Sequence, residues 1–195
     1  MNDEEDLHAY YASQASYGSE KHHNLLGEQG YSLDPELSSN RHRTYYKKDK
    51  AIVAYKGTNP LNRDDLDADA AIAIGTHRNH RQFKEASDIA TRAKGKYKNI
   101  TTTGHSLGGT KAIESANDVG GRAIVFNPGT GLWKLKTGDH KVYHNTDDFI
   151  SQRLDGKNIK KSRGGHSLDS FENKFSVVTK STRRNRSGRR SRRFR

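Results

Sequence analysis

Residues 98–109 read Lys98-Asn99-Ile100-Thr101-Thr102-Thr103-Gly104-His105-Ser106-Leu107-Gly108-Gly109, and the rest of the predicted fold is arranged around them. Its first half is rich in β-branched residues and predicts a short strand, and its second half is a Gly-x-Ser-x-Gly turn. The segment that follows carries Ala112, Ile113 and Ala116 at helical spacing and predicts a helix. A strand, a sharp turn and a helix in this order lift a serine hydroxyl to the tip of a sheet. Ser106 is therefore a candidate nucleophile.

The glycines around Ser106 have a mechanical reason. Gly104 and Gly108 flank the tightest part of the turn, where a Cβ atom would collide with the neighbouring strand and helix. The start of the helix points free N–H groups and a positive dipole end at the serine, where an oxyanion would form. A plain Gly-Ser turn is the alternative, and the predicted strand and helix on its two sides favour the nucleophile.

Length and composition set further limits. A chain of 195 residues predicts one domain, and its content of 30% hydrophobic and 30% charged residues predicts a small core. No apolar run approaches the length of a membrane span, and the acidic first six residues lack the apolar stretch of a secretory signal. The absence of cysteine rules out disulfides and thiol chemistry and suits a cytoplasmic or otherwise intracellular location.

The positive charge is concentrated at the C-terminus. Of the net charge of +12, eight charges belong to arginines between residues 183 and 195, which leaves +4 for the remaining chain. Like charges at this density repel one another, and nothing apolar is present to fold them. We expect a compact domain over residues 1–180 and a disordered tail over residues 181–195.

The segments around the central stretch predict an α/β fold. Residues 43–47 and 51–55 predict a β-hairpin, residues 80–97 an amphipathic helix, and residues 122–126 and 141–144 two apolar strands. Residues 1–40 predict a polar, loosely helical layer that docks on the sheet. Strands that alternate with helices favour a three-layer structure with a mostly parallel sheet, whose working residues lie at the carboxyl ends of the strands.

A serine nucleophile needs a histidine base and an acid, which follow it in the order serine, acid, histidine in this fold class. Asp147 and Asp148 both follow the strand over residues 141–144, and strand alternation would point their side chains in different directions. His166 is the one downstream histidine that follows a strand-end carboxylate, unlike His140 and His144. The order of the residues therefore predicts His166 as the base and leaves two candidates for the acid.

Three other predictions complete the site expected from the sequence. His105 adjoins the serine, where its side chain would point away, so we expect it to pack. The oxyanion donors would be the backbone N–H groups of Leu107 and Thr58. No metal or cofactor is expected: four carboxylates between residues 64 and 69 are more typical of a solvated loop, and His77 and His80 lack a third ligand.

The chain resembles the class 3, fungal-type lipase family of α/β-hydrolases from about Ala12 to Phe171. Four pieces carry the resemblance: Ile52-Val53-Ala54-Tyr55-Lys56-Gly57-Thr58, Thr103-Gly104-His105-Ser106-Leu107-Gly108-Gly109, Asn145-Thr146-Asp147-Asp148-Phe149-Ile150-Ser151 and Gly165-His166-Ser167-Leu168. The resemblance implies an α/β-hydrolase fold with Ser106 as nucleophile, Asp148 as acid, His166 as base and Thr58 as an oxyanion residue. Lys56 and Leu66 depart from the arginine and tryptophan that are usual in the family, and the interval from acid to histidine is short.

The segment from Gly75 to Arg81, where such lipases carry an apolar lid, is polar and basic. A triglyceride droplet would gain little from docking on it, so an esterase or phospholipase-like activity on soluble or anionic esters is favoured. In the competing hypothesis the body is inactive, and the tail from Arg183 to Arg195 binds an anionic membrane or nucleic acid without sequence preference. Such a tail would suit a viral or nucleoid-associated protein. An inactive relative that keeps the fold is a third possibility.

Overall fold

A computed structural model describes residues 3–57, 81–130 and 134–175 of the chain. A seven-stranded sheet runs through it in the order β1-β2-β3-β4-β5-β7-β9. The strands from β3 to β9 pair in parallel, whereas β1 and β2 are antiparallel to their neighbours. The strands of this sheet are β1 (Ser32–Leu33), β2 (His42–Lys47), β3 (Lys50–Tyr55), β4 (Asn99–Ser106), β5 (Arg122–Pro128), β7 (Lys141–Asn145) and β9 (Ile159–Ser162).

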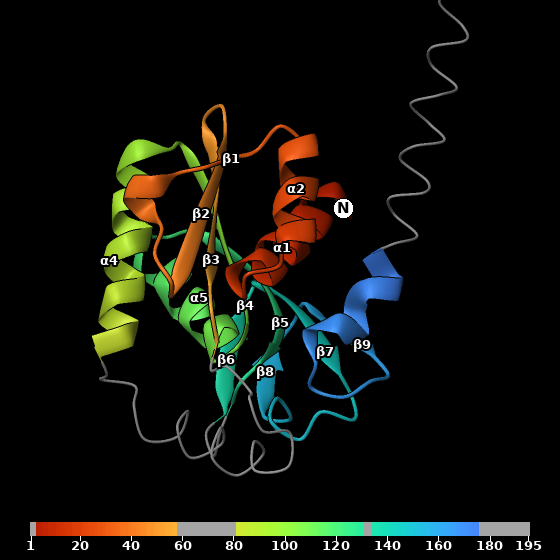
Figure 1. Ribbon diagram of the computed structural model, residues 1–195. Helices are drawn as coiled ribbons and strands as arrows, with labels where there is room; N and C mark the ends of the chain where they lie inside the picture. Colours follow the sequence, from red (N-terminus) through yellow and green to blue (C-terminus); the bar gives the residue numbers. More distant parts are fainter. Residues whose placement is uncertain (1–2, 58–80, 131–133, 176–195) are drawn as a thin grey trace, which may run out of the picture.

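Helices cover both faces of the sheet, which gives three layers (Figure 1). The helices α4 (Arg81–Lys96) and α5 (Leu107–Asp118) pack on one face, and α1 (Asp3–Ser16) and α2 (Glu20–Glu28) pack on the other. Two short 3-10 helices, η1 (Pro35–Leu37) and η2 (Leu168–Phe171), complete the layers, and β6 (Leu135–Gly138) forms a separate small sheet with β8 (Leu154–Gly156). The α/β class and the mostly parallel sheet predicted from the sequence are therefore confirmed.

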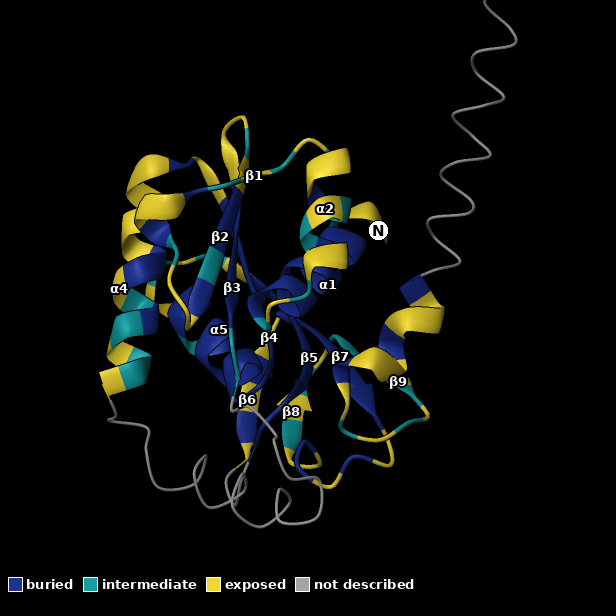
Figure 2. Ribbon diagram, in the orientation of Figure 1, coloured by how far each residue is buried: buried dark blue, intermediate teal, exposed yellow. Residues whose placement is uncertain are grey.

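Alternation along β3 and β5 divides the core between these faces. Val53 and Val125 pack toward α4 and α5, whereas Ile52 and Phe126 pack toward α1 and the C-terminal segment of the described chain. Figure 2 shows the result, with buried strands in the middle and the exposed residues on the outer sides of the helices. The core is thin but continuous, as expected for a chain with few apolar residues.

The threonines of β4 are all buried, and the helices on both sides pair with their hydroxyls. Thr102 donates to the carbonyl of Ala112 in α5 at 2.7 Å, and Thr103 donates to the carbonyl of Ala9 in α1 at 3.2 Å. A buried hydroxyl with a partner avoids the desolvation cost of an unpaired one. The β-branched strand that leads to Ser106 is thereby fixed from both layers.

The N-terminal layer is locked to β7 by a buried ion pair. Lys141 Nζ lies 2.7 Å from a carboxylate oxygen of Asp6, which also accepts a hydrogen bond from the Tyr143 hydroxyl at 2.7 Å. Residues 3–40 thus form the mostly helical layer predicted for this part of the chain, with more order than the loosely helical packing we expected. None of the helices in the described ranges is long and apolar enough to cross a bilayer.

The remaining predictions from the sequence concern the other strands, the helices and the segments outside the described residues. The hairpin, the helix over residues 80–97 and the strands over residues 122–126 and 141–144 are present with shifts of a few residues at their ends. β1, β6, β8 and β9 were not predicted, because these strands are short and mostly polar. Several predictions lie outside the described residues: Thr58, the acidic loop over residues 64–69, residues 75–80 of the lid segment with its histidines at 77 and 80, and the tail over residues 181–195.

Candidate active site

The turn between β4 and α5 has the geometry of a nucleophile elbow. Ser106 adopts a φ of 54° and a ψ of −131°, a region that residues with a Cβ rarely occupy, at a typical cost of about 1–3 kcal/mol. The pairing of β4 with β5 shifts register at this point, and the Ser106 carbonyl accepts a hydrogen bond from the Gly129 N–H at 3.0 Å. The strained residue is therefore held by its neighbours on both sides.

Close packing explains the glycines of the elbow. A Cβ atom on Gly104 would lie 2.4 Å from the carbonyl of Gly108, and one on Gly108 would lie 2.2 Å from the carbonyl oxygen of Tyr55. Neither position has room for a side chain, because the helix start and the neighbouring strand occupy that space. The mechanical reason given for these two glycines from the sequence is confirmed.

The start of α5 places backbone donors next to Ser106. Leu107 is the first residue of the helix, and the N–H groups of a first helical turn have no acceptor within the helix. Their partial positive charges favour an anion at this point. Gly57 packs against the same elbow, since a Cβ atom on it would lie 2.7 Å from the carbonyl oxygen of His105. Thr58, the other expected donor, lies outside the described residues.

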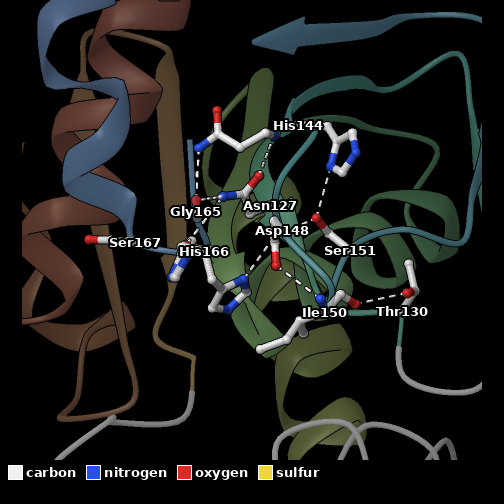
Figure 3. Close-up of polar contacts among 12 residues, drawn as sticks. Asn127, Thr130, His144, Asp148, Ile150, Ser151, Gly165, His166 and Ser167 are labelled. Atoms are coloured by element: carbon white, nitrogen blue, oxygen red, sulfur yellow. Dashed lines mark hydrogen bonds and ion pairs between the residues drawn. The ribbon is translucent and has the colours of Figure 1, made fainter. Parts of the chain in front are cut away.

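A carboxylate and an imidazole meet beside the elbow. His166 Nδ1 lies 2.8 Å from Oδ2 of Asp148, which is 1% exposed (Figure 3). Asp148 also accepts hydrogen bonds from the Ser151 hydroxyl at 2.5 Å and from the Ile150 N–H at 2.9 Å. Burial opposes ionisation of this carboxyl group, but these bonds and the nearby His166 outweigh it and lower the pKa of Asp148. Asp147 is instead exposed and accepts a hydrogen bond from the Gly164 N–H at 3.3 Å.

The loop that carries His166 is attached through its backbone. The carbonyl oxygen of His166 accepts from Asn127 Nδ2 at 3.2 Å and lies 2.6 Å from His105 Nε2, and the carbonyl of Gly165 accepts from Asn127 and Asn145 at 3.1 and 3.0 Å. Figure 3 shows Asn127 reaching this loop from the end of β5. Asn127 and Asn145 are fully buried at the ends of β5 and β7, so the sheet itself sets the position of the loop.

The ring of His166 also lies near the elbow. Its centroid is 4.7 Å from that of His105, the residue that precedes Ser106. Among the described residues no hydrogen bond joins the Ser106 hydroxyl to His166, and such bonds are often long before a substrate binds. With Nδ1 paired to Asp148, Nε2 is the ring nitrogen left to act on a hydroxyl.

A second histidine reaches Asp148 indirectly. His144 Nδ1 lies 2.8 Å from the Ser151 hydroxyl, which in turn donates to the carboxylate (Figure 3). Because the Ser151 hydroxyl donates its proton to Asp148, the Nδ1–H of His144 donates to the Ser151 oxygen. Burial lowers the pKa of His144, which favours the neutral ring with its proton on Nδ1. His140 lies elsewhere, where it accepts from the Ala123 N–H and pairs with Asn117.

Apolar side chains, both buried and exposed, lie around the elbow. Leu107, Ile150 and the half-buried Phe83 form a small cluster next to the elbow. Phe149 points outward and is 77% exposed, although both of its neighbours in the chain are buried. In the described ranges no three histidine or acidic side chains are grouped as a metal site.

Ser106, Asp148 and His166 were named as candidates from the sequence, with Asp147 as an alternative acid, but the residues that support the loop and the carboxylate were not named. Asn127, Asn145 and Ser151 carried no motif, and His105 was assigned to packing without a hydrogen-bonding role. The one available signal was position, because Asn127 and Asn145 both stand at predicted strand ends, where working residues collect.

A comparison with known protein families gives a match over most of the chain. Residues 3–148 match a family described as "Phospholipase-like: Tle-like phospholipase domain". The matched region contains Ser106 and Asp148 and ends before His166. Among curated proteins, none matches the chain.

Proposed function

Because the chain belongs to the phospholipase-like family defined by the Tle-like phospholipase domain, we propose that it cleaves carboxylic esters of lipids as a serine hydrolase. Family membership indicates hydrolysis of a lipid ester. The proposal adds the residues: Ser106 as nucleophile, His166 as base and Asp148 as acid. The finer resemblance to class 3 lipases assigns the same three residues.

The single observation that carries the proposal is the hydrogen bond between His166 and the buried Asp148, next to a serine in an elbow conformation. In the proposed reaction Ser106 Oγ bonds to the ester carbonyl carbon and gives its proton to His166 Nε2. Asp148 stabilises the imidazolium that forms. His166 then passes the proton to the departing alkoxide, and the acyl group remains on the serine.

Water completes the cycle. It gives a proton to His166 and attacks the acyl-enzyme carbonyl, and the serine leaves with that proton while the carboxylic acid is released. The negative oxygen of both tetrahedral intermediates would be held by the N–H groups of Leu107 and Thr58. The free donors at the start of α5 support the first of these assignments.

Phe149 supports a lipid surface as the setting of the reaction. The loop around it is fixed, because the N–H of Ile150 donates to Asp148 Oδ1 and its carbonyl accepts from the Thr130 hydroxyl at 2.8 Å. The aromatic ring is therefore held in solvent beside the site, where it is available to an apolar partner. The acyl region of a phospholipid bilayer is such a partner.

Covalent labelling by a fluorophosphonate probe tests the chemistry. The wild type should be labelled on the peptide that contains Ser106, and Ser106→Ala should lose both the label and the hydrolysis of short-chain nitrophenyl esters. Ser115→Ala, a change on the same helix away from the elbow, is a control for folding and should keep both. Labelling of Ser106→Ala at wild-type level would contradict the proposal.

Substrate class needs a second comparison. Phospholipid vesicles and soluble esters should be cleaved faster than emulsified triglyceride, because the lid segment of the sequence is polar and basic. A strong preference for the emulsion would overturn this part of the proposal. Deletion of residues 181–195, followed by binding to DNA and to anionic vesicles, separates the role of the arginine-rich tail from that of the body.

A further inference from the structure

His105 and Tyr17 lie beside the candidate triad but have no part in the reaction proposed above. His105 is 7% exposed, and its Nε2 lies 2.6 Å from the carbonyl oxygen of His166. Its Nδ1 lies 3.2 Å from the hydroxyl of Tyr17, which accepts a hydrogen bond from the N–H of Gly57 at 3.1 Å. The two side chains thus connect the end of β3, the elbow and the His166 loop.

The positions of the protons follow from these partners. Burial, with a smaller contribution from nearby His166, lowers the pKa of His105 to about 3, so its ring is neutral at ordinary pH. A carbonyl oxygen only accepts, which places the ring proton on Nε2. Nδ1 is then an acceptor, and the Tyr17 hydroxyl donates to it. Burial raises the pKa of Tyr17, which keeps this hydroxyl protonated.

We propose that Tyr17 and His105 are positioning residues that hold the Gly57 peptide and the His166 backbone in register with Ser106. This inference rests on the proposed function, because it assigns the two contacts to the alignment of the base and of the oxyanion side of the site. Gly57 donates to Tyr17, the Tyr17 hydroxyl donates to His105 Nδ1 and also lies 3.4 Å from the His105 carbonyl oxygen, and His105 donates to the carbonyl of His166.

A lysine holds the other end of the same peptide group. The carbonyl of Lys56 accepts from the buried Nζ of Lys111 at 2.8 Å, while the adjoining N–H of Gly57 donates to Tyr17. Both polar atoms of this peptide are therefore paired with side chains from other segments. A peptide held at both ends fixes the direction in which the chain leaves β3 toward Thr58.

The neutrality of His105 suits its position. Its ring lies 4.7 Å from that of His166, which must accept a proton during the reaction. A positive charge on His105 would oppose that step, since two like charges at this distance in a buried site repel strongly. A buried histidine donates and accepts at once without carrying charge, which neither a lysine nor an arginine does.

The test uses steady-state kinetics of the full chain on a soluble ester. Tyr17→Phe removes one hydroxyl and keeps the ring, and His105→Leu removes both hydrogen bonds. Each should lower kcat by a factor on the order of 10 to 100, since small misplacements of reacting groups have effects of this size. KM should change by less than about threefold, because uniform binding of the substrate is not altered.

Two further variants separate positioning from folding. His105→Gln retains a donor and an acceptor and should recover much of the lost kcat. The loss in Tyr17→Phe combined with His105→Leu should be smaller than the product of the two single losses, because both changes break the bond between Tyr17 and His105. Tyr45→Phe is the matched control: Tyr45 also pairs with a histidine, His23 at 3.1 Å, but outside the site, and kcat should stay the same.

The outcomes are distinguishable. If the wild type is active and Ser106→Ala is not, but Tyr17→Phe and His105→Leu keep wild-type kcat, the positioning role is wrong and the proposed function stands. Equal losses in Tyr45→Phe, or purely additive losses in the double variant, would also overturn it. A wild type that is neither active nor labelled would overturn both proposals.

Discussion

Replacement of Asp148 by asparagine has a consequence that follows from its hydrogen bonds. Oδ2 accepts from both His166 Nδ1 and the Ser151 hydroxyl, and Oδ1 accepts from the N–H of Ile150. An asparagine has one oxygen and one NH₂ group, so in either orientation a donor faces a donor. If the oxygen pairs with Ile150, the NH₂ group meets His166, which must then move its proton to Nε2.

That tautomer cannot take a proton from Ser106. In a comparable triad the same exchange lowers kcat by about 10⁴-fold, and we expect a loss of about 10³- to 10⁴-fold in Asp148→Asn. A buried donor left without an acceptor costs about 1–3 kcal/mol, so the free energy of unfolding should fall by an amount in this range. The kinetic effect is larger than this instability explains, provided the variant is assayed well below its unfolding transition.

Asp147→Asn is the matched control. Asp147 is exposed, and its contact with the Gly164 N–H at 3.3 Å is open to an amide oxygen as well as to a carboxylate. This variant should keep kcat within about threefold of the wild type and unfold at a similar urea concentration, as surface changes usually do. Equal kinetic losses in the two variants, or a larger loss in Asp147→Asn, would refute the assignment of the acid. Kinetics on a soluble ester with urea unfolding of each variant provide both measurements.

Three further predictions concern the surroundings of the site. Burial lowers the pKa of Lys111 to about 8, so from about pH 8 to 10 the unfolded chain holds a proton that the folded chain has released. The free energy of unfolding, relative to that of Lys111→Met, should therefore rise with pH by up to about 3 kcal/mol. Urea unfolding of both proteins across this pH range would show a constant difference if the reasoning fails. Gly108→Ala should destabilise the fold by about 3 kcal/mol or more in thermal unfolding. Gly95→Ala, with nothing within 4 Å of the new Cβ atom, should be neutral or stabilising, and similar effects in the two variants would be inconsistent with the elbow packing. Phe149→Ser should reduce vesicle binding and phospholipid cleavage without changing kcat on a soluble ester, whereas Tyr46→Ser, at a less exposed aromatic residue, should leave vesicle binding unchanged. Equal vesicle binding by the wild type and Phe149→Ser would argue against the lipid contact.

The sequence predicted the parts of the fold that depend on local pattern. β4, the elbow and α5 follow each other directly, and each has a signal of its own in residues 98–116: β-branched residues, spaced glycines and apolar residues at helical spacing. The hairpin of β2 and β3 and the amphipathic α4 were found in the same way. β8 and β9 carry too few residues to show a period, and β9 also has two lysines among its four residues.

The choice between Asp147 and Asp148 shows where pattern reasoning stops. Alternation along a strand orients side chains only while the strand continues, and β7 ends at Asn145. Beyond it the Asp148 N–H bonds back to the Asn145 carbonyl at 3.1 Å, so a turn decides which carboxylate faces inward. The sequence shows that a turn follows, but its inward side depends on contacts with Ser151 and with His166.

The His166 loop was difficult to place for a different reason. The loop is bonded to the sheet through the carbonyl oxygens of residues 165 and 166. Every amino acid has a carbonyl oxygen, so the side chains of the loop, apart from His166, do not indicate how the loop is held. The side chains that hold it belong to Asn127, Asn145 and His105, which lie 20 to 61 residues earlier in the chain. A contact between a distant side chain and a backbone atom has no spacing rule. It follows that changes of side chain at Ser167 should be tolerated far better than changes at Asn127, although Ser167 adjoins the proposed base and Asn127 does not.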